Sequence, residues 1–150
     1  MTQERKEQET IRQIMSKTVR TIEKSKSVRS ALDIMIKHDI GSVVVVDGSK
    51  VFGIITERDI MRNIEGEAPY LDKRVGDACS TPVISVGPDV ESWEAFEIML
   101  RNKIRRLPVL DEDQRLVGIV TERDLFKWVV QVTYEPNVPK EIVDLIRQSS

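Results

Sequence analysis

The sequence predicts an α/β protein of the α+β type, built from two copies of one β-α-β-β-α unit. Two observations support this fold class. The octapeptide "GIITERDI" at residues 53–60 returns as "GIVTERDL" at 118–125, identical at six of eight positions. The segments that precede both octapeptides also show the same order of strand-like alternation and helical periodicity. An internal repeat of this kind indicates two similarly folded halves.

The repeat extends well beyond the octapeptides. A shift of 64 positions aligns Ala31 and Met35 with Ala95 and Met99, and one extra residue before Gly118 raises the shift to 65. The repeated region covers about residues 14–63 and 78–127. The expected organisation is an N-terminal helical extension at 1–13, a first repeat at 14–66, a connector at 67–77, a second repeat at 78–130, and a tail with a short helix at 131–150.

Each copy is expected to start with a strand and continue into an amphipathic helix. The strands are "TVRTI", residues 18–22, and "PVISV", residues 82–86. The first helix starts at Lys26 or Ser27, and Asp89 is the expected N-cap of the second, because short polar side chains satisfy free N–H groups there.

A strand pair and a short helix complete each copy. The strands are "SVVVVD" and "KVFGII" in the first copy, and "RLPVLD" and "RLVGIV" in the second. Asp47-Gly48 between apolar runs is typical of a hairpin turn. Short helices are expected to begin at Thr56 and Thr121.

Segments outside the repeats are also expected to form helices. The first, at residues 4–15, has Ile11, Ile14 and Met15 on its apolar side. The tail breaks at Pro136 and Pro139 and then restarts as a short helix. Its apolar stripe should dock on the module or on a partner, because exposed apolar patches favour association. The stripe consists of Ile142, Val143, Leu145 and Ile146.

The composition suits a globular protein with no catalytic centre of its own. Its 150 residues carry 23 basic and 25 acidic side chains, a balance that argues against a dedicated nucleic-acid-binding protein. Cys79 is the only cysteine and His38 the only histidine, so no disulfide, thiolate zinc set or HExxH motif can form within the chain. We expect a cytoplasmic protein without a signal peptide or membrane span.

The repeated Thr-x-x-Asp pattern has two interpretations. In the first, Thr56 with Asp59 and Thr121 with Asp124 are capping boxes, which stabilise a helix start without any ligand. In the second, the helix N-terminus and threonine bind a phosphate, while the carboxylate accepts two ribose hydroxyls. One copy alone does not distinguish these interpretations.

Two β-α-β-β-α units in tandem, each with G-h-h-[ST]-x-x-D on its last strand and helix, resemble the CBS domain, named after cystathionine beta-synthase. The segment "IRRLPVLDEDQRLVGIVTERDL" is close to the family pattern throughout. The resemblance implies a stand-alone Bateman module, in which two repeats pack about a pseudo-twofold axis. It also implies two clefts between the repeats that bind adenosine ligands such as AMP, ADP, ATP, S-adenosylmethionine or NAD, and disc-like homodimers.

The resemblance also implies the residues of the clefts. Asp59 and Asp124 would accept ribose hydroxyls, and Thr56 and Thr121 would contact phosphate. Adenine would be held by backbone and apolar contacts at the first strands and at the starts of the second strands. These positions are Thr18, Val19, Arg20, Pro82, Val83, Ile84, Ile40 and Ile104.

The two clefts are not expected to be equivalent. The Asp59 cleft would receive phosphate-binding cations from the second copy, namely Arg105, Arg106 and Arg123. In the Asp124 cleft, the positions equivalent to Arg105 and Arg106 are Gly41 and Ser42. Arg58 would then be its obvious local cation. A charge-assisted contact contributes about 1.5 to 3 kcal/mol, so the Asp59 cleft should bind phosphorylated ligands more tightly.

The sequence therefore predicts a regulatory adenosine-ligand sensor that is not an enzyme and uses no cofactor or metal. Its expected partners are the small molecule, a second copy of the chain and a protein effector, with neither nucleic acid nor membrane. Trp93 or Trp128 is expected at a dimer interface, while Met35, Met61, Met99 and Phe126 belong to the core or an interface. Two alternatives are a scaffold with vestigial clefts and a nucleic-acid-binding accessory protein that uses basic clusters.

Overall fold

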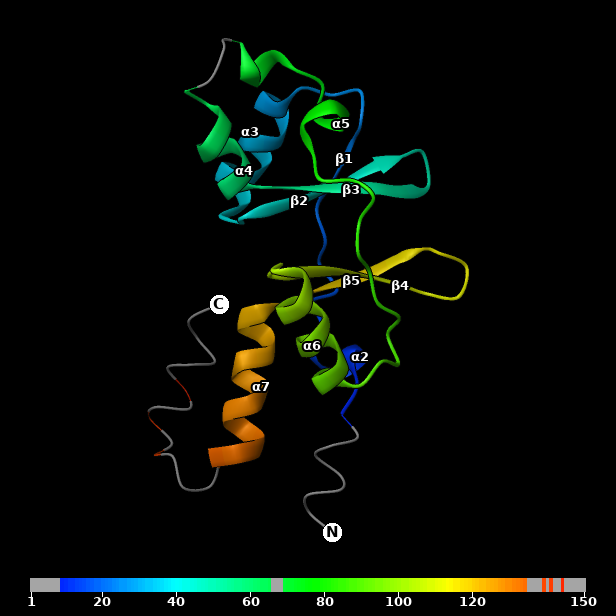
Figure 1. Cartoon of the computed structure of the whole chain (residues 1–150), viewed down its shortest axis with the longest axis vertical. Helices are drawn as coiled ribbons and strands as arrows, with labels where there is room; N and C mark the ends of the chain where they lie inside the picture. The colour runs from blue at the N-terminus through cyan, green and yellow to red at the C-terminus, as the bar shows by residue number, and fades with distance from the viewer. Residues whose placement is uncertain (1–8, 66–68, 135–138, 140, 142–143, 145–150) are drawn as a thin grey trace. The chain divides into compact units, whose positions relative to one another are not determined.

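The computed structural model of the chain describes residues 9–65, 69–134, 139, 141 and 144 (Figure 1). The chain divides into two compact units. The repeat-1 unit contains residues 18–84 and 112–116, and the repeat-2 unit contains residues up to Lys17, 85–111 and those from Val117 onward. Residues 4–8 of the predicted N-terminal helix and the apolar stripe of the tail lie outside the described residues. Within the described part of that predicted helix, only Ile11–Ile14 are helical.

The repeat-1 unit contains a three-stranded sheet with the order β1-β2-β3. Strand β1 (Thr21–Glu23) pairs in parallel with β2 (Ser42–Asp47), and β2 pairs antiparallel with β3 (Lys50–Thr56). The predicted hairpin is confirmed, whereas β1 begins three residues later than the strand predicted at 18–22. The hairpin turns at Gly48, whose φ of 63° lies in the left-handed region that glycine adopts without steric cost. Strand β2 therefore lies in the middle of the sheet.

Helices cover this sheet and form its core. Helix α3 (Val28–His38) begins after Ser27, whose hydroxyl accepts the Ser30 N–H at 3.1 Å, which confirms the predicted start. Helix α4 (Glu57–Asn63) follows β3 directly, and η1 (Tyr70–Asp72) and α5 (Val75–Ala78) complete the unit. The buried core comprises Ile22, Val28, Ala31, Met35, Val43, Val45, Ile55, Ile60, Tyr70 and Val75.

The repeat-2 unit repeats the order helix, strand pair and helix, but its sheet has two strands. Helix α6 (Ser92–Asn102) leads to the strand pair β4 (Arg106–Leu110) and β5 (Leu116–Thr121), and helix α7 (Glu122–Tyr134) follows β5. Each of its eight buried core residues is equivalent by the repeat to a core residue of the other unit. They are Ile11, Val86, Ala95, Met99, Leu107, Val109, Val120 and Leu125.

The strand predicted at 82–86 is wrong. Only Val86 pairs there, through a single parallel bridge to Val109. In the first copy, the Lys24 N–H extends the equivalent pairing by donating to the Val46 carbonyl at 2.9 Å. The equivalent residue in the second copy is Pro88, which has no N–H to donate, so this ladder ends early.

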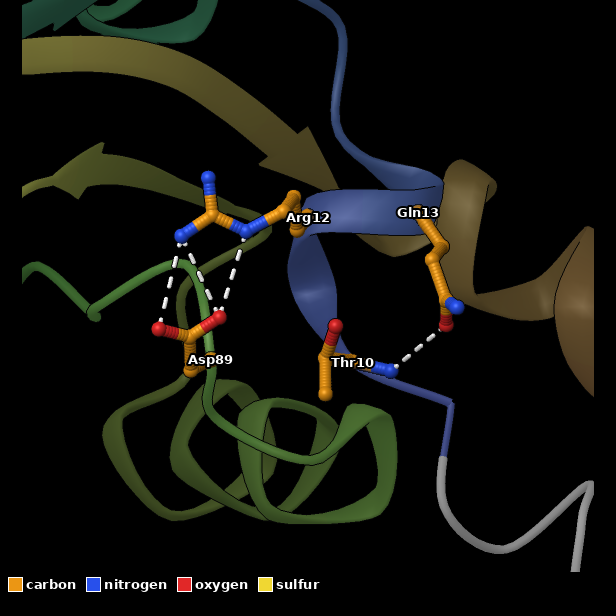
Figure 2. Close-up of polar contacts among 4 residues, drawn as sticks. All are labelled: Thr10, Arg12, Gln13 and Asp89. Carbon is orange, nitrogen blue, oxygen red and sulfur yellow. Dashed lines mark hydrogen bonds and ion pairs between the residues drawn. The ribbon is translucent and has the colours of Figure 1, made fainter.

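The predicted N-cap at Asp89 is also wrong, because α6 begins two residues later with Glu91 at the N-cap position. Asp89 instead pairs with Arg12 on the short helix α2 (Ile11–Ile14), where Arg12 Nε donates to Asp89 Oδ1 at 3.2 Å (Figure 2). The N–H of Thr10 donates to Gln13 Oε1 at 3.0 Å and closes the start of α2. The Asp89 carboxylate therefore pairs with Arg12, which is distant in sequence, and does not cap α6.

The one-turn helices α2 and α5 are equivalent by the repeat, and each packs in the unit of the other repeat. In the repeat-2 unit, the Ile11 N–H donates to the Val90 carbonyl at 2.9 Å. In the repeat-1 unit, the Val75 N–H donates to the Lys26 carbonyl at 2.6 Å. Ile11 and Val75 are fully buried, so the start of each repeat completes the core of the other unit.

The exchanged segments cross the last strand of each unit at a glycine. Ser80 pairs with Ile54 beside Gly53, and Ser16 pairs with Ile119 beside Gly118. A Cβ atom on Gly53 would lie 2.5 Å from the Ser80 carbonyl oxygen, and one on Gly118 would lie 2.9 Å from the Ser16 carbonyl oxygen. The glycine that opens both octapeptides is therefore required by this close backbone approach.

Gly53→Ala and Gly118→Ala should each lower the free energy of unfolding by about 1 to 3 kcal/mol, because the new methyl group must displace the crossing backbone. Gly87→Ala is the matched control, since the nearest atom to its Cβ would be the Leu110 carbonyl oxygen at 4.0 Å. Urea denaturation of the three variants measures the difference. Equal stability of all three would contradict the crossing.

Candidate functional site

The first candidate site lies where β3 ends and α4 begins. Thr56 is the N-cap of α4, and its hydroxyl accepts the Asp59 N–H at 3.2 Å. Asp59 Oδ2 in return accepts the Thr56 N–H at 2.9 Å and the Thr56 hydroxyl at 3.0 Å. The capping box expected from the sequence is confirmed here in its aspartate form.

The second copy builds the same junction between β5 and α7. The Thr121 N–H donates to Asp124 Oδ2 at 2.9 Å, and the Asp124 N–H donates to the Thr121 hydroxyl at 3.1 Å. Both aspartates are partly buried in their first helical turns. The repeated tetrapeptide therefore produces two matched helix starts.

The capping box does not use the whole carboxylate. In both copies the cap engages Oδ2, which leaves Oδ1 of Asp59 and Asp124 outside it. A carboxylate has acceptor capacity for several donors, so the second oxygen can bind a ligand hydroxyl while the first holds the helix. The two interpretations of Thr-x-x-Asp are thus compatible in this geometry.

Backbone bonds connect each helix start to the beginning of the preceding strand pair. The Glu57 N–H donates to the Gly41 carbonyl at 2.9 Å, and the Glu122 N–H donates to the Arg105 carbonyl at 2.7 Å. Gly41 and Arg105 are therefore equivalent in structure as well as in sequence. The same position beside a candidate site carries a cation in one unit and no side chain in the other.

Arg105 already has an acidic neighbour in its own unit. Its Nε lies 3.7 Å from Glu122 Oε2, and both side chains are more than half exposed. An exposed pair at this distance is weak, typically below 1 kcal/mol, so a stronger anion can replace Glu122. The predicted pairing of Arg105 and Arg106 with Asp59 joins residues of different units and stays a prediction.

The residues expected around adenine lie next to strand and helix ends. Thr18–Arg20 precede β1, and the Arg20 carbonyl accepts the Val44 N–H at 3.1 Å. Residues 82–84 are partly to fully exposed and lie outside any strand. Ile40 and Ile104 are half-buried and follow the helix ends at Asp39 and Lys103, which adopt the left-handed conformation.

Tyr70 is a residue of the Asp59 neighbourhood that the sequence interpretation placed in a plain connector. Its side chain packs in the repeat-1 core, and its buried hydroxyl has no hydrogen-bond partner among the described residues. Burial raises the pKa of the Tyr70 hydroxyl, and the negative charge of Asp59 raises it further. Burial likewise raises the pKa of the Cys79 thiol. Only the three-dimensional packing brings these groups near Asp59.

The single histidine lies at a helix end. His38 is the last residue of α3, and partial desolvation with the charges of Arg20 and Lys37 lowers its pKa. Within the described ranges, no three His, Cys, Asp or Glu side chains gather as ligands for a metal ion. None of the described helices has the length and apolar character needed to cross a membrane.

Comparison with solved structures shows the same fold in other proteins. A protein with CBS domains from Burkholderia ambifaria is 30% identical with a TM-score of 0.76, over 88% of this chain and 99% of that one. The CBS domain pair of protein MJ0100, in complex with 5'-methylthioadenosine and S-adenosyl-L-methionine, is 30% identical with a TM-score of 0.72. That match covers 79% of this chain and 94% of the other.

Similarity to curated proteins includes a segment of a larger enzyme. Inosine-5'-monophosphate dehydrogenase of Methanocaldococcus jannaschii is 37% identical over 116 residues. These residues are 77% of this chain but 22% of that enzyme, and they match its CBS region and not its catalytic domain. The chain spans about a fifth to a half of the length of the first three curated relatives.

The CBS domain model matches two segments, residues 11–66 and 75–131. The first match begins at α2 and ends just beyond α4, and the second begins at the equivalent helix α5 and ends within α7. The matched segments, the repeated core and the shared fold lead to one conclusion: the chain belongs to the CBS domain family and carries a tandem pair of CBS domains.

Proposed function

We propose that this CBS pair is a regulatory module that binds an adenosine-containing ligand, such as AMP, ADP, ATP or S-adenosylmethionine, and catalyses no reaction. The observation that carries the proposal is the pair of matched helix starts. Each presents an aspartate oxygen outside its capping box, next to a strand start that carries a glycine or a cation. Two such starts in one chain allow two ligand sites.

The chemistry of these helix starts suits the two ends of a nucleotide. Asp59 and Asp124 can accept the vicinal hydroxyls of a ribose through Oδ1, whereas phosphate would be repelled by the same carboxylates. The hydroxyl of Thr56 donates to Asp59 in the free state, so contact with phosphate requires it to rotate. Ligand binding therefore exchanges a bond within the cap for a bond to phosphate.

The ligands of a related CBS pair support the adenosine part of the proposal. Protein MJ0100 was solved with 5'-methylthioadenosine and S-adenosyl-L-methionine. These two molecules share an adenosine group and differ in charge at the 5' position. We infer that this chain also binds the adenosine group. We propose that its arginines select among ligands that differ in charge at the 5' position.

The two sites should differ in their preference for phosphate. We propose that Arg105 and Arg106 act with Asp59, while the Asp124 site has Gly41 and Ser42 at the equivalent positions. Loss of a charge-assisted pair changes affinity by about tenfold or more. The Asp59 site is then the tighter one for AMP or ATP, and the Asp124 site suits a less negative ligand.

We also propose that the module forms a homodimer through exposed apolar side chains on its helices. Ile36 and Leu100 are equivalent by the repeat and are 70% and 65% exposed, and Met61 and Phe126 are equivalent and are 74% and 56% exposed. Apolar residues retained at the same exposed position in both copies indicate a surface that becomes covered.

The proposed regulation requires two packing states of the module. A ligand that binds these two states with different affinity can shift the balance between them, and a protein effector can recognise that change in packing.

Calorimetric titration with AMP should detect binding, and Asp59→Asn should weaken the tighter event by about tenfold or more. Asp124→Asn should leave that event unchanged, and Arg105→Ala should weaken it as Asp59→Asn does. Loss of the tighter event in Asp124→Asn would overturn the assignment of the two sites. A ligand at 100 times its dissociation constant should stabilise the protein by about 2.7 kcal/mol, which a thermal-shift assay detects. The absence of a shift with every adenosine ligand would favour a scaffold.

Asp59→Asn and Asp59→Ala separate the cap from the ligand site. The asparagine carbonyl can still accept the Thr56 N–H, so the free protein should lose less than about 1 kcal/mol, whereas alanine removes the cap and should cost about 1 kcal/mol or more. Both should weaken AMP binding. If asparagine bound AMP as the native chain does, the aspartate would have only a structural role. Urea denaturation without ligand supplies the stability values.

Sedimentation velocity tests the homodimer. Met61→Glu and Phe126→Glu together should shift the protein toward a monomer, because two carboxylates would be buried unpaired in the contact. Glu65→Gln and Glu94→Gln provide a control on exposed residues. An unchanged sedimentation coefficient in the first double variant would place the contact elsewhere.

A further inference from the structure

The exchange of the one-turn helices creates a cluster of positive side chains in the repeat-1 unit. Residues 24–29 and 73–74 are distant in sequence but joined by backbone bonds. The Val28 N–H donates to the Lys73 carbonyl at 2.9 Å, and the Gly76 N–H donates to the Lys24 carbonyl at 2.9 Å. Figure 1 shows α5 in the same unit as the start of α3. The cluster consists of Lys24, Lys26, Arg29, Lys73 and Arg74.

Two members of this basic cluster are partly neutralised by carboxylates. Lys24 Nζ lies 3.0 Å from Asp47 Oδ2, and Arg29 lies 3.4 Å from Asp72 Oδ1. Asp77 on α5 adds a third carboxylate nearby. Glu23, which precedes Lys24, adds a fourth and accepts the Gly48 N–H. The five cations therefore outnumber four acids, and the local charge is positive in a chain whose formal net charge is -2.

The remaining three members project into solvent. Lys26, Lys73 and Arg74 are exposed, and none of them forms an ion pair with another residue in the part of the chain that the structure describes. Their backbone groups hold the exchanged segment, but their charged ends contribute nothing to that packing. A ligand group can reach all three without displacing a protein partner.

The fold itself does not require these charges. The repeat-2 unit has the same backbone bonds, since the Ile11 and Arg12 N–H groups donate to the carbonyls of Val90 and Pro88. Yet none of its five equivalent positions carries a cation, and one carries a carboxylate. Those positions are Pro88, Val90, Trp93, Glu9 and Thr10.

We propose that this basic cluster is a docking surface for an acidic segment of a protein partner. Charge complementarity decides the class of occupant. The three free cations can each contact one carboxylate of an extended Asp/Glu-rich segment. A nucleic acid fits less well, because the chain as a whole is negative and nearby aromatic rings are not free to stack on bases. Lys24 already covers Phe52 at 5.3 Å from its ring centroid, and Tyr70 is buried.

Fluorescence anisotropy with a labelled oligoglutamate peptide at low salt tests the proposal on the full chain. Native protein should bind the peptide, and the affinity should fall with added salt. Lys26→Glu, Lys73→Glu and Arg74→Glu together should weaken binding by about tenfold or more, since three contacts become repulsive. The matched control, Lys37→Glu, Lys50→Glu and Arg62→Glu, makes the same change in net charge at exposed positions and should retain binding to within about twofold.

Several outcomes would overturn the proposal. These are absence of peptide binding by the native protein, an equal loss in both triple variants, and tighter binding of single-stranded DNA or RNA than of the peptide by the same cluster. Thermal melting checks that each variant folds. If the glutamate variant does not fold, Lys26→Gln, Lys73→Gln and Arg74→Gln replace it, with a smaller loss of affinity expected.

Discussion

The exchange of short segments between the repeats is the constraint on which the other features of this CBS pair depend. Ile11 and Val75 fill the cores of the units formed by the other repeat, so neither core is complete without residues from both halves of the chain. The crossing of these segments over β3 and β5 leaves room only for Gly53 and Gly118. The glycine is followed in both copies by the strand end and the helix start that carry the candidate site.

In the proposed function, one side chain of each candidate site serves two purposes. Asp59 and Asp124 each hold a helix start through one oxygen, and the other oxygen lies outside the cap. The cap would hold the carboxylate in position before a ligand arrives, which would lower the entropic cost of binding. The sequence pattern alone could not distinguish a cap from a binding site, because the same residue types satisfy both descriptions, and the repeat only doubles the pattern.

Local patterns predicted the local structure well. The hairpin strands, the start of α3 at Ser27 and the helices after Thr56 and Thr121 follow from periodicity and capping chemistry. The failures at 82–86 and at Asp89 come from contacts distant in sequence. A missing N–H at Pro88 ends a ladder whose partner lies some 20 residues away. The burial of Tyr70 near Asp59 has the same origin, because its connector has no pattern of its own to reveal it.

Differences between the two copies are more informative about function than their similarities. All eight core positions of the repeat-2 unit remain apolar in both copies, because packing demands it. Packing makes no such demand where Gly41 is equivalent to Arg105, or where Lys73 and Arg74 are equivalent to Glu9 and Thr10. The fold accepts residues of different charge at these positions, so packing alone does not explain the asymmetry. In our proposals the first difference serves a small anionic ligand and the second a partner protein, so the two interactions would use separate residues.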